Sequence, residues 1–142
     1  MIQRIQTIWL LLGVVLSALT FKLTFFIGTQ VSNADGVINN VINATYNIPL
    51  IVSATASILL GLLAIFLFKD RKKQIVITAL AALASIALTA LCFYFKKDFP
   101  VAGVLALTSV FYFAIPVLYI LAILGIRKDQ KIIANLNSSR LR

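Results

Sequence analysis

The sequence predicts an all-α membrane protein, built as a bundle of four transmembrane helices with both termini in the cytoplasm. Three observations support this prediction: the composition, four long apolar stretches, and the distribution of Lys and Arg. Of the 142 residues, 61% are hydrophobic and 12% are charged, whereas a soluble domain carries about 25% charged residues. This composition excludes an intrinsically disordered chain. The single cysteine, Cys92, excludes a fold held together by internal disulfides.

Four apolar stretches are long enough to cross a lipid bilayer. A helix rises about 1.5 Å per residue, so about 20 apolar residues span a hydrocarbon core about 30 Å thick. A buried helix of a soluble protein usually keeps a polar face, and the strands of a membrane barrel alternate between apolar and polar residues. Neither pattern is present, and Lys22 is the only charge inside the stretches. We therefore expect one membrane domain over residues 1–142, with helices at residues 8–27, 48–68, 75–95 and 101–126.

Two of the expected helices are preceded by capping residues. Asn47 is followed by Pro49, and Asp98 is followed by Pro100. A side-chain oxygen at the N-cap accepts a hydrogen bond from the first turn, where proline is tolerated because its missing N–H has no helical partner. We therefore expect the second helix to begin just after Asn47 and the fourth just after Asp98.

Lys and Arg are concentrated on alternate connections. The N-terminal segment, the connection 69–74 and the tail 127–142 hold most of them, whereas the loop 28–47 holds none and the last connection only Lys96 and Lys97. Segments rich in Lys and Arg stay in the cytoplasm, so both termini are expected there, with the loop 28–47 outside. Membrane topology then explains the net charge of +9, and we expect no nucleic-acid partner.

Two segments outside the apolar stretches leave alternatives open. In the outer loop, Asp35-Gly36 is a typical hairpin turn, around which residues 29–31 and 37–38 pair as short strands; a flexible loop is the alternative. The cytoplasmic tail 127–142 is either solvated charge that fixes the topology, an amphipathic foot on anionic lipid, or a docking segment for a partner.

The sequence offers few groups for catalysis. It lacks His and Glu, and its aspartates lie outside the apolar stretches, at Asp35, Asp70, Asp98 and Asp129. Ionisable groups inside a membrane are usually functional. Lys22, however, lies near the end of its stretch, where its stem reaches the headgroups; a contact with a substrate or partner is the alternative. Cys92 is expected to be a packing residue. We therefore predict no enzymatic activity, no metal site and no cofactor.

Small residues recur every four positions on two of the expected helices. This spacing lets helix backbones approach closely, either within the bundle or against a second protein or a second copy. Pro116 removes a hydrogen bond in the middle of the fourth stretch and predicts a kink, which is either a static bend or a gating hinge. The candidate packing residues are Ser53, Ser57 and Gly61 on the second stretch, and Ala81, Ser85 and Thr89 on the third.

Both ends of the chain resemble one family. The opening Met1-Ile2-Gln3-Arg4-Ile5-Gln6-Thr7, the segment Ile126-Arg127-Lys128-Asp129-Gln130-Lys131 and the closing Ser139-Arg140-Leu141-Arg142 are similar to the ends of a family of short four-span membrane proteins of unknown function from Bacteroidota. The resemblance implies an inner-membrane location and no assigned activity. We predict that the matching polar residues contact lipid or a partner on the cytoplasmic side; they are Gln3, Arg4, Gln6, Arg127, Lys128, Asp129, Arg140 and Arg142.

These features favour a non-catalytic inner-membrane protein that acts as an accessory or structural subunit of a larger complex. The expected partners are the lipid bilayer and other integral membrane proteins. The alternative is a small transporter or channel acting as a homo-oligomer, in which Pro116 and the hydroxyl groups of the spans line a mildly polar path.

Overall fold

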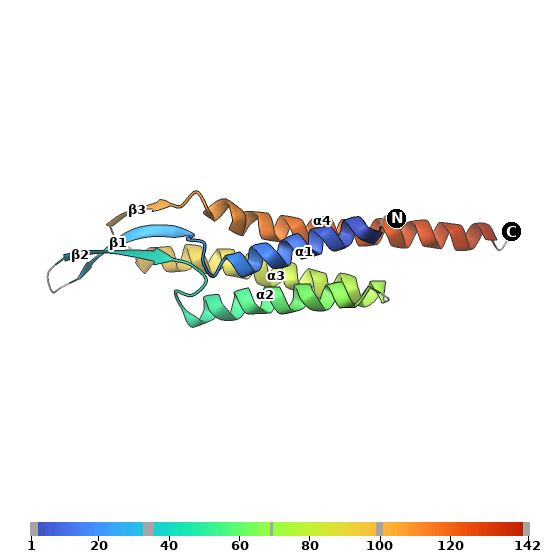
Figure 1. Ribbon diagram of the computed structural model, residues 1–142, viewed down its shortest axis with the longest axis horizontal. Helices are drawn as coiled ribbons and strands as arrows, with labels where there is room; N and C mark the ends of the chain where they lie inside the picture. The colour runs from blue at the N-terminus through green and yellow to red at the C-terminus, as the bar shows by residue number, and fades with distance from the viewer. Residues whose placement is uncertain (1–2, 33–35, 69, 99–100, 141–142) are drawn as a thin grey trace.

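The computed structural model describes residues 3–32, 36–68, 70–98 and 101–140. Helices lie side by side along the long axis, a small sheet lies at one end, and the C-terminal part of the last helix projects from the other (Figure 1). The helices are α1 (Gln3–Leu19), α2 (Ile48–Phe66), α3 (Arg71–Phe95) and α4 (Ser109–Arg140), with a short 3₁₀ turn at Lys96–Asp98. The strands are β1 (Phe26–Ser32), β2 (Gly36–Ile42) and β3 (Val101–Leu105).

Three of the described helices are long and apolar enough to cross a membrane: α2, α3 and the part of α4 over Ser109–Ile132. The apolar part of α1, Ile5–Leu19, is shorter. Helix α1 nevertheless runs along much of α4, because Gln6 at its start donates a hydrogen bond to the carbonyl of Gly125, and the carbonyl of Thr20, just past its end, accepts one from Tyr112. The chain therefore contains a helical bundle of membrane type, with a first helix shorter than expected.

Helix α2 begins where the sequence predicts. The side chain of Asn47 accepts a hydrogen bond from the backbone N–H of Ile48 at 3.0 Å, and Pro49 occupies the first turn. This confirms Asn47 as the N-cap, in the position where a proline costs no helical hydrogen bond.

The predicted start of the fourth helix after Asp98 is wrong. Residues Val101–Leu105 form β3, and α4 begins only at Ser109. The backbone N–H of Ala106 donates to the carbonyl of Phe25 at 3.1 Å, which fixes the end of β3 against the start of β1. Likewise, the first helix ends at Leu19 rather than Ile27. Apolar character continues from helix into strand in both segments, so hydropathy alone does not mark the change.

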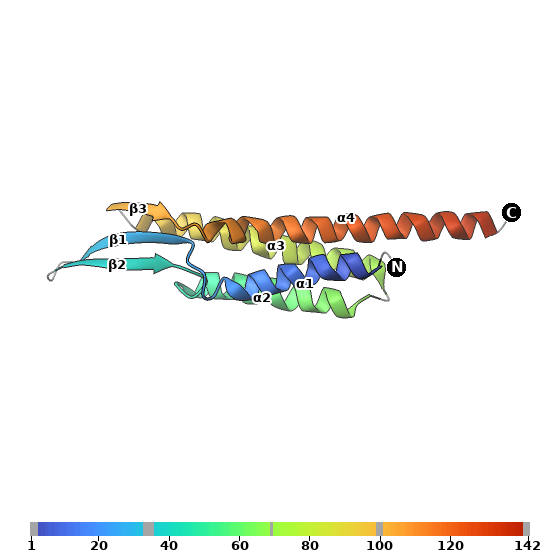
Figure 2. The ribbon, with the colours of Figure 1, turned by 45° about the horizontal axis from the view of Figure 1, so that its top comes forward.

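The strands form an antiparallel sheet in the order β2-β1-β3. Strands β1 and β2 pair as a hairpin, which is one of the two alternatives that the sequence left open, with Gln30 opposite Ile38 and Val31 opposite Val37. Asp35 of the predicted turn lies outside the described residues. The sequence predicts an all-α protein. The sheet corrects this prediction, because the described chain is mostly helical but also contains three strands. In Figure 2 the sheet continues the bundle along its long axis, beyond the ends of α1 and α2.

Aromatic side chains fill the core beside the sheet. The ring of Phe25 makes edge contacts with Tyr112 and Phe93, at centroid distances of 5.1 Å and 5.2 Å. The hydroxyl of Tyr112 lies 2.9 Å from the carbonyl oxygen of Thr20 and 2.7 Å from that of Leu23, so it holds the chain that leaves α1. Cys92 is fully buried in this core, whereas Lys22 is exposed.

Candidate functional site: the polar end of the bundle

Polar side chains from both ends of the sequence meet where α1 begins. The amide nitrogen of Gln6 donates to the carbonyl oxygen of Gly125 at 3.0 Å and to a carboxylate oxygen of Asp129. Both side chains are buried, with exposed fractions of 7% for Gln6 and 5% for Asp129. Because a buried carboxylate without a donor is costly, Gln6 stabilises Asp129 and ties the first helix to the last.

A second glutamine joins the other two helices at the same end. The amide nitrogen of Gln74 on α3 donates to the carbonyl oxygen of Ala64 on α2 at 3.0 Å. Gln74 is buried, and its backbone carbonyl oxygen accepts a hydrogen bond from the hydroxyl of Thr78 at 2.8 Å. The sequence analysis did not select Gln74, because this residue ends a connection expected to be solvated. Its only signal is a polar side chain at the edge of an apolar helix.

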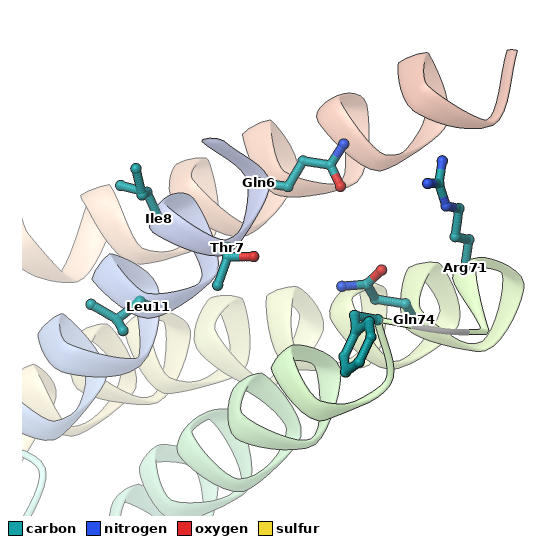
Figure 3. Close-up of a pocket in the computed structure, with 7 residues that line it drawn as sticks. Gln6, Thr7, Ile8, Leu11, Arg71 and Gln74 are labelled. Atoms are coloured by element: carbon teal, nitrogen blue, oxygen red, sulfur yellow. The ribbon is translucent and has the colours of Figure 1, made fainter. Parts of the chain in front are cut away.

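A cavity of about 480 Å³ opens between these two glutamines. Figure 3 shows Gln6 and Thr7 of α1 on one side of it, and Gln74 and Arg71 of α3 on the other. One part of the wall is therefore polar and the rest is apolar. The lining residues are Gln6, Thr7, Ile8, Leu11, Phe68, Arg71 and Gln74.

Arg71 brings a positive charge to this pocket. Its Nη1 atom is buried and has no hydrogen-bond partner among the described residues. The nearest acid in the sequence, Asp70, instead pairs with Lys73 at 3.0 Å on the surface. A guanidinium group binds carboxylates and phosphates through several N–H groups at once, so this unsatisfied donor makes the pocket suited to an anion.

The other candidate contacts on this side of the molecule lie apart from the pocket lining. Arg127 and Lys128 are exposed on α4. The side chains of Gln3, Arg4 and Arg140, and all of Arg142, lie outside the described residues. The structure thus brings together Gln6 and Asp129 of the predicted set, and adds Arg71 and Gln74, which the sequence analysis did not select.

The small residues of α2 face α1 and α4. The hydroxyl of Ser57 lies 3.1 Å from that of Ser17 on α1, and the Ser57 carbonyl accepts a hydrogen bond from the hydroxyl of Tyr119 at 3.1 Å. A Cβ atom on Gly61 would lie only 2.6 Å from the hydroxyl oxygen of Tyr119. The α2 residues of the candidate packing set are therefore buried within the chain, where Tyr119 fills the space that they leave.

The small residues of α3 are buried as well. Ser85 donates to the carbonyl of Ala82 at 2.7 Å, and Thr89 to that of Ser85 at 3.1 Å. The Thr89 hydroxyl also lies 3.4 Å from the carbonyl oxygen of Tyr112 on α4. The buried candidate packing residues are Ser53, Ser57, Gly61, Ala81, Ser85 and Thr89.

Helix α4 continues through Pro116 as a single helix.

The model of one protein family, the domain of unknown function DUF4293, matches residues 2–138. The chain belongs to the DUF4293 family. No curated protein and no solved structure matches it. The family match spans the start of α1 and most of α4, so the Gln6–Asp129 contact lies within it. In the described part of this DUF4293 chain, no group of three or more His, Cys, Asp or Glu side chains is placed to hold a metal ion.

Proposed function

We propose that this chain is a non-catalytic integral protein of a bacterial inner membrane, and that it serves as an accessory subunit of a larger membrane complex. The observation that carries this proposal is the length of α4. Asp129 lies beside Gln6 near the start of α1, yet α4 continues to Arg140. The extension is about 16 Å long at the usual helical rise, and both views show it projecting alone from the bundle (Figures 1 and 2). A single projecting helix is suited to contact another protein.

The placement of α1 supports four crossings rather than three. Its contacts with α4 extend from Gly125 at one end to Tyr112 at the other, which is about 20 Å of helix. A helix that follows its neighbour over this distance occupies the same layer of the bilayer. The short connection at the sheet end of α1, including exposed Lys22, then lies at headgroup level.

The distribution of charge supports a cytoplasmic location for the polar end. Lys72, Arg127 and Lys128 are exposed at the end where α1 begins. Lys96 and Lys97 are at the sheet end, and the hairpin between β1 and β2 has no Lys or Arg. Because basic segments are retained in the cytoplasm, both termini are assigned to that side and the sheet to the other.

The sheet offers a second surface for a partner. In the order β2-β1-β3, the outer edges of β2 and β3 pair with no other described strand. Open edges are positions where another chain can add a strand. The proposed accessory subunit therefore has one surface for a partner on each side of the membrane: the extension of α4 on one side and the edges of the sheet on the other.

The alternative role as a transporter or channel receives less support. The ring of Tyr119 packs against Gly13 and Gly61, where added Cβ atoms would lie 3.0 Å from Cε1 and 2.6 Å from the hydroxyl oxygen, respectively. This contact fills the centre between α1, α2 and α4. A transport path would therefore have to run between copies of the chain rather than through one copy.

Affinity purification in a mild detergent tests the accessory role. We expect the full chain to co-purify with unrelated membrane proteins at a fixed stoichiometry, identified by mass spectrometry. Deletion of residues 131–142 should abolish this recovery, and the full-length variant Ile132→Asp, which alters an exposed position on the extension, should weaken it. Both variants must retain the unfolding midpoint of the wild type. Recovery of this chain alone, or the same partners with the deletion, would refute the accessory role.

A further inference from the structure

We propose that the pocket at the polar end binds an anionic membrane lipid, with the guanidinium group of Arg71 on the phosphate of the headgroup and the acyl chain along Ile8 and Leu11. This inference rests on the membrane placement proposed above. It does not rest on the accessory role.

An unsatisfied cation lines the pocket. Arg71 lines a cavity of about 480 Å³, and its Nη1 atom is buried without a partner in the described structure. Burying a charged donor without an acceptor costs more free energy than burying an uncharged polar group without a partner. An anionic oxygen at this position removes the penalty, and a phosphate offers several acceptors to the planar guanidinium.

The charge around the pocket also favours an anion. At this end, Lys72, Arg127 and Lys128 are exposed, so the surrounding field attracts anions. The acids offset only part of it: the carboxylate of Asp70 is paired with Lys73, and that of Asp129, bound by the neutral Gln6, is a single negative charge against these cations. The pocket is therefore unsuited to a cationic ligand and suited to one with net negative charge.

The apolar wall of the pocket distinguishes a lipid from a free phosphate ion. Ile8 and Leu11 line the pocket and are also 54% and 52% exposed on the outer face of α1. Phe68 adds a large exposed ring at the end of α2. A ligand that pairs with Arg71 and continues along this face must be amphiphilic, with a charged head and an apolar tail.

The depth of the pocket in the proposed membrane placement also fits a lipid. Apolar residues of α1 begin beside the pocket and continue away from the cationic end, toward Leu19. Arg71 is the first residue of α3, about one helical turn before its apolar run begins at Ile75. These positions place the guanidinium at the level of lipid phosphates and the Ile8–Leu11 face at the level of the acyl chains. The cavity volume is within the range of about 300–1,000 Å³ that is usual for small-ligand sites.

Native mass spectrometry of the full chain, released from nanodiscs of equal parts phosphatidylglycerol and phosphatidylcholine, tests the proposal. We expect the wild type to retain phosphatidylglycerol in preference to phosphatidylcholine. Arg71→Gln should lower the apparent affinity for phosphatidylglycerol about tenfold, the effect of losing one charge-assisted contact. The matched control Lys131→Gln removes a positive charge from an exposed position at the same end and should change the affinity less than about twofold.

Further measurements distinguish lipid binding from binding of free phosphate, and test whether a variant loses affinity only because it misfolds. Inorganic phosphate and glycerol phosphate should not displace the retained lipid, whereas Leu11→Ser should weaken its retention. Arg71→Lys, which keeps the charge but not the planar group, should have an intermediate affinity with an unchanged unfolding midpoint. Equal losses for Arg71→Gln and Lys131→Gln, equal retention of both lipids, or displacement by inorganic phosphate would each overturn the proposal. None of these results depends on whether partner proteins co-purify.

Discussion

Replacing Gly61 with alanine is expected to destabilise the bundle at the point where α1, α2 and α4 meet. An added Cβ atom would lie 2.6 Å from the hydroxyl oxygen of Tyr119, 2.6 Å from a methyl group of Val14 and 3.3 Å from another Tyr119 ring atom. Carbon atoms in favourable contact are about 3.5–4.0 Å apart. Both neighbours must therefore move by about 1 Å, and both belong to helices that are held by other contacts.

The expected magnitude follows from three contributions. Overpacking of a core costs about 1–3 kcal/mol. Displacement of the Tyr119 hydroxyl also weakens its 3.1 Å hydrogen bond to the carbonyl of Ser57, which contributes about 1 kcal/mol. The higher helix propensity of alanine stabilises the folded variant by up to about 1 kcal/mol and offsets part of this loss. We therefore expect Gly61→Ala to lower the free energy of unfolding by about 1–3 kcal/mol.

The assay is reversible unfolding in mixed micelles titrated with sodium dodecyl sulfate, followed by circular dichroism. Tyr119→Phe removes the hydroxyl group and should cost about 1 kcal/mol alone. In the Gly61→Ala background the same change also relieves a clash, so its cost should be smaller by at least about 0.5 kcal/mol. Equal stability of Gly61→Ala and the wild type, or strict additivity of the two changes, would refute this packing.

Three other predictions use the same unfolding assay or a related one. Gln6→Ala should destabilise the protein by about 1–3 kcal/mol, because the buried carboxylate of Asp129 loses a donor; an equal loss in Gln6→Ala and in the Gln6→Ala/Asp129→Ala double variant would contradict this. Asn47→Ala should cost about 1 kcal/mol through loss of the N-cap of α2, and Asn47→Asp should restore most of it. Gly103→Ala places a Cβ atom in steric conflict with the edge of the Phe26 ring and should speed amide hydrogen exchange in β3; unchanged protection there would be inconsistent with the strand contact.

The helical part of the fold was predictable because it depends on local properties. Long apolar stretches and the Asn47 cap are visible in the chain itself, and they locate α2 and α3 closely. The sheet was only partly predictable. Its β1–β2 hairpin has a turn signal at Gly36, whereas Val101–Leu105 is continuous in hydropathy with the helix that follows. Its strand conformation is set by pairing with β1, which is distant in sequence.

The candidate site was less predictable because it depends on tertiary contacts. Gln6 and Asp129 are 123 positions apart, and their proximity follows only from the antiparallel packing of α1 and α4. Arg71 belongs to a basic connection for which membrane topology is a sufficient explanation. The property that distinguishes Arg71 from Lys72 is burial beside a cavity, and burial of a single cation at a helix end has no sequence signature.

The central claim is that four helices cross the membrane with the polar, cationic end in the cytoplasm. Cysteine labelling with a membrane-impermeant maleimide tests it most directly, in a Cys92→Ala background with single cysteines at exposed Thr45, Lys72 and Arg127. We predict that Thr45→Cys is labelled in cells with only the outer membrane opened, and that Lys72→Cys and Arg127→Cys are labelled only after the inner membrane is permeabilised. Labelling of Lys72→Cys and Arg127→Cys from opposite sides, or recovery of the chain without membranes, would contradict the claim.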